Sequence, residues 1–273
     1  MTHYLDAEGT RHVLAAADAR IVCLVPSITE LLCALDLTSQ LVGRTGFCVH
    51  PRAALRKIPK VGGTKDVDLP AIRALAPSHV VVNIDENRRE TALALREFVP
   101  HVVVTHPLGP TDNPPLMRLL GGIFGRDAQA NALAAAFEER YRSVCAQRSG
   151  PTQRVLYLIW RDPWMSVARD TYISRTLALF DWHTLPRESA TRYPSLKLED
   201  FAGQVDRVLL SSEPYPFRAR HLGEIRAALP GVPVALINGE MTSWYGARAL
   251  EGLAYLQQFT REPPAMITAR VGA

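Results

Sequence analysis

Short apolar runs alternate with amphipathic stretches along most of this chain. β-Branched, apolar runs occupy residues 21–25, 79–82 and 101–105, and helical patterns cover residues 69–75 and 89–98. Apolar runs of this length, bounded by proline and polar residues, are typical of buried strands. Strands that alternate with helices predict βαβ units and an α/β fold with a parallel sheet.

The first of these units, Arg20 to Leu37, has the clearest boundaries. Pro26 ends the apolar run, and Ser27 and Glu30 then have the spacing of a capping box, which predicts a helix start at Ser27. A strand that leads directly into a helix N-terminus is a common ligand position in open α/β sheets. The unit is therefore either part of a ligand site or a well-capped structural unit.

The second half of the chain repeats the order of elements in the first. Helix, strand, polar tip, helix, proline and strand follow one another from residue 69 to 105 and again from residue 198 to 237. Aligning Leu69 with Leu198 and Val80 with Val208 requires a gap of one residue. The repeat predicts two similar α/β lobes.

A different pattern separates the two halves. Residues 128–145 contain no glycine or proline, and Leu133, Phe137, Tyr141 and Val144 fall on one helical face. We therefore predict two Rossmann-like α/β lobes joined by a single long rigid helix. The expected domains are an N-terminal extension (1–19), an N-terminal lobe (20–110), the connecting helix (111–150) and a C-terminal lobe (151–273).

Composition and charge restrict the class of protein only moderately. Hydrophobic residues make up 47% of the chain, and a net charge of +4 is carried by scattered residues, which predicts no nucleic-acid partner. No stretch approaches the roughly 20 apolar residues of a transmembrane helix. The first residues lack a basic start followed by an apolar core. The expected location is the cytoplasm as the chain stands, or the periplasm if an export signal has been removed.

Aromatic residues gather in loops at or near the predicted strand ends. Only 7% of the chain is aromatic, yet these loops hold three of its four tryptophans. A cleft with such walls suits a large, flat, partly apolar ligand with a few polar groups. The residues concerned are Phe47, Trp160, Trp164, Tyr193, Tyr215, Trp244 and Tyr245.

The loop 45–51 combines an aromatic ring, a thiol and an imidazole. Phe47 is a candidate stacking surface, and Cys48 and His50 are candidate ligand contacts or metal donors. The alternative is a solvent loop with a buried phenylalanine and cysteine. A protein metal site usually supplies three or four ligands, so this pair alone predicts no metal site.

The common catalytic motifs are missing from the sequence. It contains no Gly-x-Ser-x-Gly, no Gly-x-Gly-x-x-Gly, no phosphate-binding Gly-x-x-x-x-Gly-Lys and no His-Glu-x-x-His. Asp85, Glu86 and Glu213 are carboxylates at strand tips that suit general acid–base roles. Such residues more often cap helices or form ion pairs, and we predict that the protein is not an enzyme.

Several segments together resemble a known family. RIVCLVPSITELLCALDL, GRTGFCVHP, VGGTKDVDLPAIRALAPSHVVV, RYPSLKLEDF and TSWYGAR occur in an order and spacing similar to the helical-backbone metal receptors. These are the class III substrate-binding proteins, and the resemblance is strongest to their cobalamin-binding members, which serve vitamin B12 ABC importers. It extends from about Arg20 to Phe259.

The resemblance implies a non-enzymatic corrinoid-binding protein for transport, trafficking or storage, with a cobalamin-like ligand between the lobes and no catalytic cofactor. Phe47 and Tyr193 match aromatic contact positions of the family. Ser243, Trp244 and Tyr245 match the closing wall of the cleft. Trp160 and Trp164 lie in a loop that also lines it.

The resemblance also implies a possible ABC permease partner. Importer-type members present one surface glutamate on each lobe to arginines of the permease. Glu199 keeps this position in the second lobe, whereas Pro70 stands there in the first. This departure leads to the hypothesis of a corrinoid binder that works in the cytoplasm.

Two other functions remain open. A ferric-siderophore or haem binding protein has a related fold, and Arg44, Arg161 and Arg192 are candidate contacts for an anionic chelate. An enzyme acting on a cobamide or a nucleotide-like ligand would use Asp85, Glu86 or Glu213.

Overall fold

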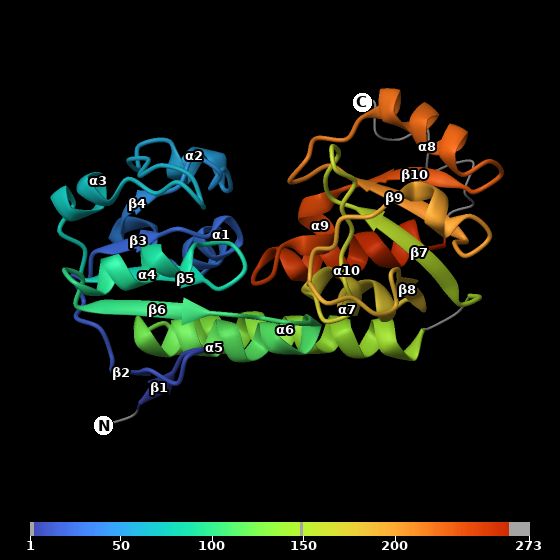
Figure 1. Ribbon diagram of the computed structural model, residues 1–273. Coiled ribbons are helices and arrows are strands. Elements are labelled where there is room, and N and C mark those ends of the chain that lie inside the picture. The colour runs from blue at the N-terminus through green and yellow to red at the C-terminus, as the bar shows by residue number, and fades with distance from the viewer. Residues whose placement is uncertain (1–2, 148–149, 262–273) are drawn as a thin grey trace. The chain divides into compact units, whose positions relative to one another are not determined.

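Two four-stranded parallel sheets form the frame of this computed structural model, which describes residues 3–147 and 150–261 (Figure 1). The chain divides into two compact units. Among the described residues, lobe 1 comprises 3–107, 111–138 and 245–248. Lobe 2 comprises 108–110, 139–147, 150–244 and 249–261. Of the predicted domains, residues 1–2, 148–149 and 262–273 lie outside the described part.

The sheet of lobe 1 has the strand order β4-β3-β5-β6. All neighbouring strands are parallel, and the sheet packs a core of valine, leucine and isoleucine side chains. The strands are β3 (Ile21–Cys23), β4 (Leu41–Arg44), β5 (His79–Asn83) and β6 (His101–Thr105). The helices are α1 (Pro26–Ala34), α2 (Arg52–Leu55), α3 (Leu69–Ala74), α4 (Arg89–Arg96) and α5 (Asn113–Ile123).

The sheet of lobe 2 has the strand order β10-β9-β7-β8 and is also parallel. Alternate residues of its strands enter two apolar clusters, with Tyr157 and Leu209 in one and Leu156 and Leu210 in the other. Both faces of the sheet are therefore buried. The strands are β7 (Gln153–Leu158), β8 (Trp182–Thr184), β9 (Arg207–Ser211) and β10 (Val234–Ile237). The helices are α7 (Tyr172–Ala178), α8 (Leu222–Ala228), α9 (Gly239–Ser243) and α10 (Arg248–Phe259).

The two sheets share one topology. In chain order, each places its second strand at one edge, followed by the first, third and fourth. The strands β5 and β9 are both third, as the alignment of Val80 with Val208 requires. The predicted repeat and the predicted α/β fold of two lobes are confirmed.

Helix α6 (Asp127–Ala146) belongs to both lobes, because the boundary between them falls after Glu138. Its buried residues include Ala130, Ala134, Phe137 and Val144, which recur at helical spacing. The long helix predicted from residues 128–145 is therefore present. Helix α5 precedes it and is separated from it by a turn at Gly125, whose φ is +65°.

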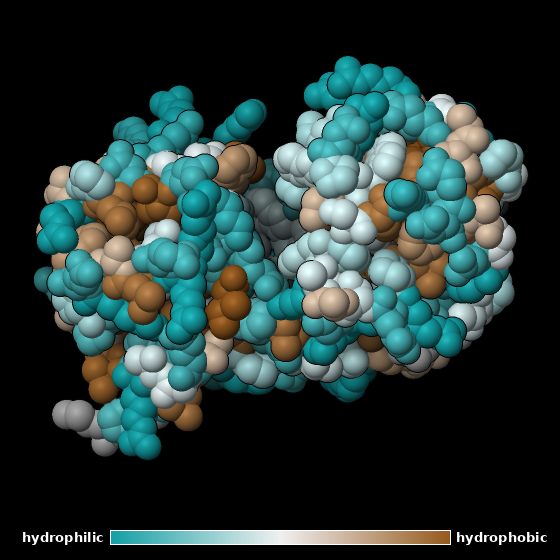
Figure 2. All heavy atoms as spheres, in the orientation of Figure 1, coloured by the Kyte–Doolittle hydropathy of each residue, from teal (hydrophilic) through white to brown (hydrophobic). Residues whose placement is uncertain are grey.

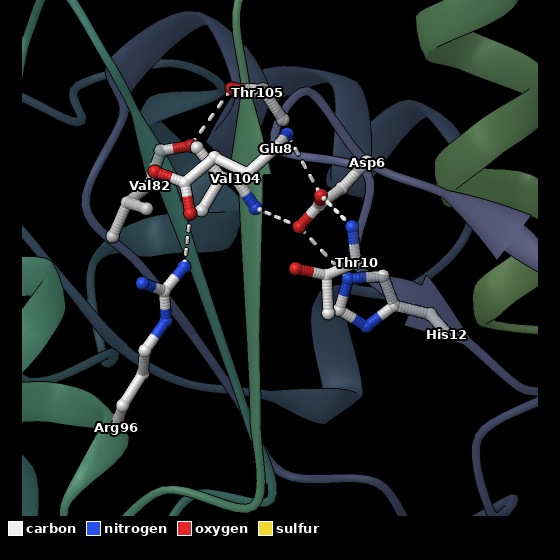
Figure 3. A network of polar contacts seen from close by, with 8 residues as sticks. All are labelled: Asp6, Glu8, Thr10, His12, Val82, Arg96, Val104 and Thr105. Carbon is white, nitrogen blue, oxygen red and sulfur yellow. Dashed lines mark hydrogen bonds and ion pairs between the residues drawn. The ribbon is translucent and has the colours of Figure 1, made fainter.

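The N-terminal residues form part of lobe 1. The hairpin of β1 (Tyr4–Leu5) and β2 (Arg11–His12) encloses Asp6, whose carboxylate accepts hydrogen bonds from the Val104 amide (3.0 Å) and from His12 Nε2 (3.0 Å) (Figure 3). The Ala7 amide donates to the Val104 carbonyl (2.9 Å). Strand β6 is an edge strand, so these contacts cover a sheet edge that would otherwise be free.

Several local predictions differ from the structure. Helix α1 begins at Pro26 with Val25 as its N-cap, so the predicted capping box of Ser27 and Glu30 is wrong. Proline has a fixed φ and no N–H, which favours it in the first helical turn and places Ser27 beyond the cap position. The short strand β8 and helix α9 lie where the sequence pattern predicted no such elements. Among the described residues, no helix is both long and apolar enough to cross a membrane.

Candidate ligand-binding surfaces

The loops after the strands carry the most unusual exposed side chains. Because all strands of each sheet are parallel, their carboxyl ends gather at one edge of that sheet, where open α/β folds usually bind ligands. Four large hydrophobic residues are exposed in loops that follow β4, β5 and β7: Phe47 (63%), Val49 (44%), Ile84 (45%) and Trp160 (41%). Three of them belong to lobe 1 and one to lobe 2.

The Phe47 loop of lobe 1 is held from inside by Arg44. This buried guanidinium donates to the carbonyls of Thr45 (3.1 Å), Cys48 (3.0 Å) and Leu55 (3.2 Å). The loop backbone is thereby fixed while the Phe47 ring remains in solvent. Arg44 is consequently a loop-supporting residue in this structure, with its donors directed to backbone oxygens.

Cys48 and His50 occupy different environments in the same loop. The Cys48 side chain is fully buried, and its Sγ lies 3.1 Å from both the Thr29 and the Thr45 hydroxyl oxygens. Burial raises the pKa of this thiol, which keeps it neutral and poor as a metal ligand. His50 is half-buried. Among the described residues, no group of three or more His, Cys, Asp or Glu side chains could hold a metal ion.

The two tryptophans after β7 have different roles. Trp164 stacks on Phe217 with ring centroids 5.9 Å apart and an interplanar angle of 5°, and it packs against the core. Trp160 is exposed and meets the ring of Tyr215 edge-on at 5.7 Å. The loop between them closes through the Met165 amide, which donates to the Trp160 carbonyl (3.1 Å). Trp164 thus supports the loop and Trp160 presents its ring to solvent.

The remaining candidates of lobe 2 are less exposed. Tyr193 is half-buried and packs against the core cluster that contains Tyr157. Arg161 is ion-paired with Glu224 (2.8 Å), and Arg192 donates to the Asp170 carbonyl (3.1 Å). The arginines proposed as contacts for an anionic chelate therefore have protein partners.

Glu213 anchors the segment that follows β10. Its carboxylate accepts hydrogen bonds from the Ser243 hydroxyl (2.7 Å) and from Trp244 Nε1 (2.8 Å), all within lobe 2. Trp244 is only 8% exposed. This carboxylate has a positioning role in the structure, which the sequence pattern did not reveal.

The next residues of the chain are anchored in lobe 1. The Tyr245 hydroxyl donates to Glu86 (2.5 Å), the Gly246 amide donates to Asn113 Oδ1 (2.7 Å), and Arg248 forms a two-point ion pair with Glu30. Tyr245 is 6% exposed. Burial, followed by the charge of Glu86, raises its pKa well above the usual value.

The three candidate acid–base carboxylates therefore take part in structural contacts. Glu86 and Glu213 follow the equivalent strands β5 and β9 and accept hydrogen bonds from the 243–245 segment. Asp85 lies 3.5 Å from His106. The two candidate docking positions, Glu199 and Pro70, are both exposed.

Comparison with known proteins identifies the family. The model of the family described as periplasmic binding protein matches residues 21–181, which is more than half of the chain. The chain belongs to this family. No match to a curated protein was found.

Solved structures share the fold at low sequence identity. The periplasmic vitamin B12 binding protein BtuF of Vibrio cholerae superposes with a TM-score of 0.76 at 19% identity, over 89% of this chain and 98% of that one. The periplasmic heme-binding protein RhuT of Roseiflexus sp. RS-1 gives 0.77 at 21% identity, over 89% and 97%. The heme-binding protein HutB of Vibrio cholerae gives 0.75 at 21% identity, over 90% and 100%.

Proposed function

We propose that this chain is a non-enzymatic binding protein for a large, flat metal chelate, with a cobalamin-like corrinoid as the leading ligand. The observation that carries the proposal is the set of exposed apolar side chains Phe47, Val49, Ile84 and Trp160 at the carboxyl edges of the sheets. Membership in the periplasmic binding protein family and the shared fold of vitamin B12 and heme binders support it.

The physical argument rests on apolar area held in a fixed place. Each exposed ring loses contact with water when a flat macrocycle covers it, and a buried aromatic anchor commonly contributes about 1–3 kcal/mol. Arg44 fixes the backbone beside Phe47, and Tyr215 contacts the ring of Trp160. These side chains and loops then lose little conformational entropy when the ligand binds.

The available metal donors favour a corrinoid over haem. A haem protein usually supplies an axial His, Cys, Tyr or Met ligand, whereas a cobalamin brings a nitrogen ligand of its own. Cys48 is buried and hydrogen-bonded, and the Tyr245 hydroxyl donates to Glu86. Half-buried His50, three residues after Phe47, supports haem as the second candidate.

Direct titration separates these ligands. We expect cobinamide and cyanocobalamin to release or absorb heat in calorimetry and to shift their visible spectra in the presence of the protein. Haem binding without corrinoid binding would establish the second candidate. If neither macrocycle binds, the proposed ligand class is wrong.

The exposed rings provide the matching mutational prediction. Phe47→Ala and Trp160→Ala should each weaken binding by about 1–3 kcal/mol, because each removes exposed aromatic area without disturbing the core. Leu93→Ala is the control, since Leu93 is 50% exposed but lies on α4 and not in one of the loops that follow the strands. Equal affinities for all four proteins would show that the ligand surface lies elsewhere.

We further propose that lobe 2 docks to an arginine-bearing membrane permease through Glu199. This side chain is exposed at the start of a short 3-10 helix (Leu198–Phe201), as Pro70 is at the start of α3 in lobe 1. Only one of the two equivalent positions is acidic. A role in import requires this docking, and a role in trafficking or storage does not.

A further inference from the structure

A pocket of about 190 Å³ opens at the amino-terminal edge of the lobe 2 sheet, the edge opposite to the aromatic loops. The first residues of β7, β8 and β9, which are Gln153, Trp182 and Arg207, all line it. Gln147 and Arg261, which follow α6 and α10, line it as well. All of the described residues that line the pocket belong to lobe 2.

Arg207 is the unusual side chain of this pocket. It is only 6% exposed, and among the residues that the structure describes, its buried Nε and Nη1 atoms have no hydrogen-bond partner. Its guanidinium carbon lies 4.9 Å from the centroid of the Trp182 ring. Burial of a charged group is costly unless the group is paired and hydrogen-bonded. Burial also lowers the pKa of Arg207.

The charges around the pocket have one predominant sign. Two arginines and no carboxylate occur among the described residues that line it. The C-terminal ends of α6 and α10 each contribute at most about half a negative elementary charge, so the described lining keeps a net positive charge. Gln147 Oε1 accepts from Arg261 Nη2 (3.1 Å) and from Gln257 Nε2 (3.0 Å), which holds Arg261 beside the pocket.

We propose that this pocket is a binding site for a small oxyanion, either phosphate or carboxylate. The planar guanidinium of Arg207 offers two neighbouring N–H donors, which match the two oxygens of such an anion. The volume equals that of roughly six water molecules at about 30 Å³ each, which accommodates phosphate and part of its hydration shell. The site is distinct from the proposed macrocycle surface and does not depend on that ligand.

The NMR signals of the tryptophan indole N–H groups provide a local readout of anion binding. The chain has four tryptophans, and Trp182 lines the pocket whereas Trp160 and Trp244 belong to the loops at the other edge of the sheet. Titration with inorganic phosphate at constant ionic strength should shift the Trp182 indole N–H signal in a saturable way and leave the Trp160 signal unchanged. Acetate, titrated in the same way, tests the carboxylate form.

The Trp182 signal is assigned with a Trp182→Phe variant. A Trp182 signal that does not move with either anion would overturn the proposal. So would a small, unsaturable drift of all four indole signals, because that pattern indicates an adventitious ion only.

Arginine variants test the assignment of the donor. Arg207→Met should lower phosphate affinity at least tenfold, and Arg261→Met should lower it severalfold. Arg226→Met, which removes the same charge from the exposed surface of α8, should bind phosphate as the unmodified chain does. If Arg207→Met does not fold, Arg261→Met still decides the question. Unchanged affinity in the folded Arg207 or Arg261 variant contradicts the proposal.

Discussion

His79 links the stability of lobe 1 to pH through a single buried ring. It begins β5, stacks on His101 at 4.6 Å and meets Phe124 edge-on at 5.1 Å. Its Nδ1 lies 2.9 Å from the Ser78 hydroxyl oxygen. Burial, and then the charges of His101 and His12, lower the pKa of His79 from 6.5 to about 4.

This shift predicts a loss of stability in mild acid. The unfolded chain protonates His79 near pH 6.5 and the folded chain only near pH 4, so unfolding takes up a proton between these values. The free energy of unfolding should fall as the pH drops from 6.5 to 4, by at most about 3 kcal/mol from this residue. Urea denaturation of the unmodified chain and of His79→Phe at pH 7, 5.5 and 4 measures it. The His79→Phe variant should show a shallower pH dependence, and identical slopes would contradict the assignment.

Single residues also show where sequence reasoning stops. Trp160 and Trp164 are four positions apart in the same loop, yet one ring is exposed and the other stacks on Phe217. That difference depends on Phe217, which is distant in sequence. In the same way, the sequence presents Glu86 and Glu213 as candidate acid–base carboxylates. Only the fold shows that they accept hydrogen bonds from Tyr245, Ser243 and Trp244.

Among the elements, the segment 245–248 shows how a short stretch is fitted to lobe 1. Gly246 has φ +79°, and a Cβ atom built there would lie 3.1 Å from the Leu31 Cβ. Its amide donates to Asn113 Oδ1, which is buried. Both the left-handed backbone and the close approach therefore require glycine.

Gly246→Ala should lower the free energy of unfolding by about 1–3 kcal/mol, because alanine is strained at positive φ and crowds Leu31. Gly223→Ala is the matched control. Gly223 lies in α8, where an added Cβ meets no described atom within 4 Å, so higher helix propensity should stabilise the chain by roughly 0.5–1 kcal/mol. Chemical denaturation of both variants measures the two effects. Equal changes in both would refute the proposed role of Gly246.

The elements that the sequence predicted best are those with a strong local pattern. Strands β6 and β10 and helix α6 match their predicted positions closely, because β-branched runs and uninterrupted helix formers determine them locally. Strand β8 was missed, since its three residues contain two polar ones and depend on pairing with β7. Helix α9 was missed because Gly239 and the polar residues after it are typical of a loop, while Asn238 caps the helix through its side chain.

At the scale of the whole molecule, the two lobes repeat one strand order but differ in their surface charge at equivalent positions. Exposed Glu199 and Pro70 stand at the starts of equivalent elements before β9 and β5. The two lobes therefore need not contribute equally to docking, even though they share one topology. The face drawn in Figure 2 is a mosaic of hydrophilic and hydrophobic residues.

The docking proposal predicts an asymmetric effect of charge reversal. Glu199→Arg should abolish co-purification with an arginine-bearing permease, because it replaces attraction by repulsion. Asp200→Arg, next to it and also exposed, should have a much smaller effect. Both variants should keep the macrocycle affinity of the unmodified chain. Undiminished permease binding by Glu199→Arg would exclude this docking position, and no permease binding by the unmodified chain would favour trafficking or storage.

The division of the chain into lobes determines which gene fragments can encode a complete lobe. Lobe 1 is encoded by three separate stretches, the last of them residues 245–248. A gene fragment that ends at residue 138 therefore omits the Arg248 guanidinium that pairs with Glu30 and the Gly246 amide that reaches Asn113. Lobe 2 is interrupted in the same way, so no single break in the gene yields a complete lobe, and a fragment meant to fold as lobe 1 has to include residues 245–248.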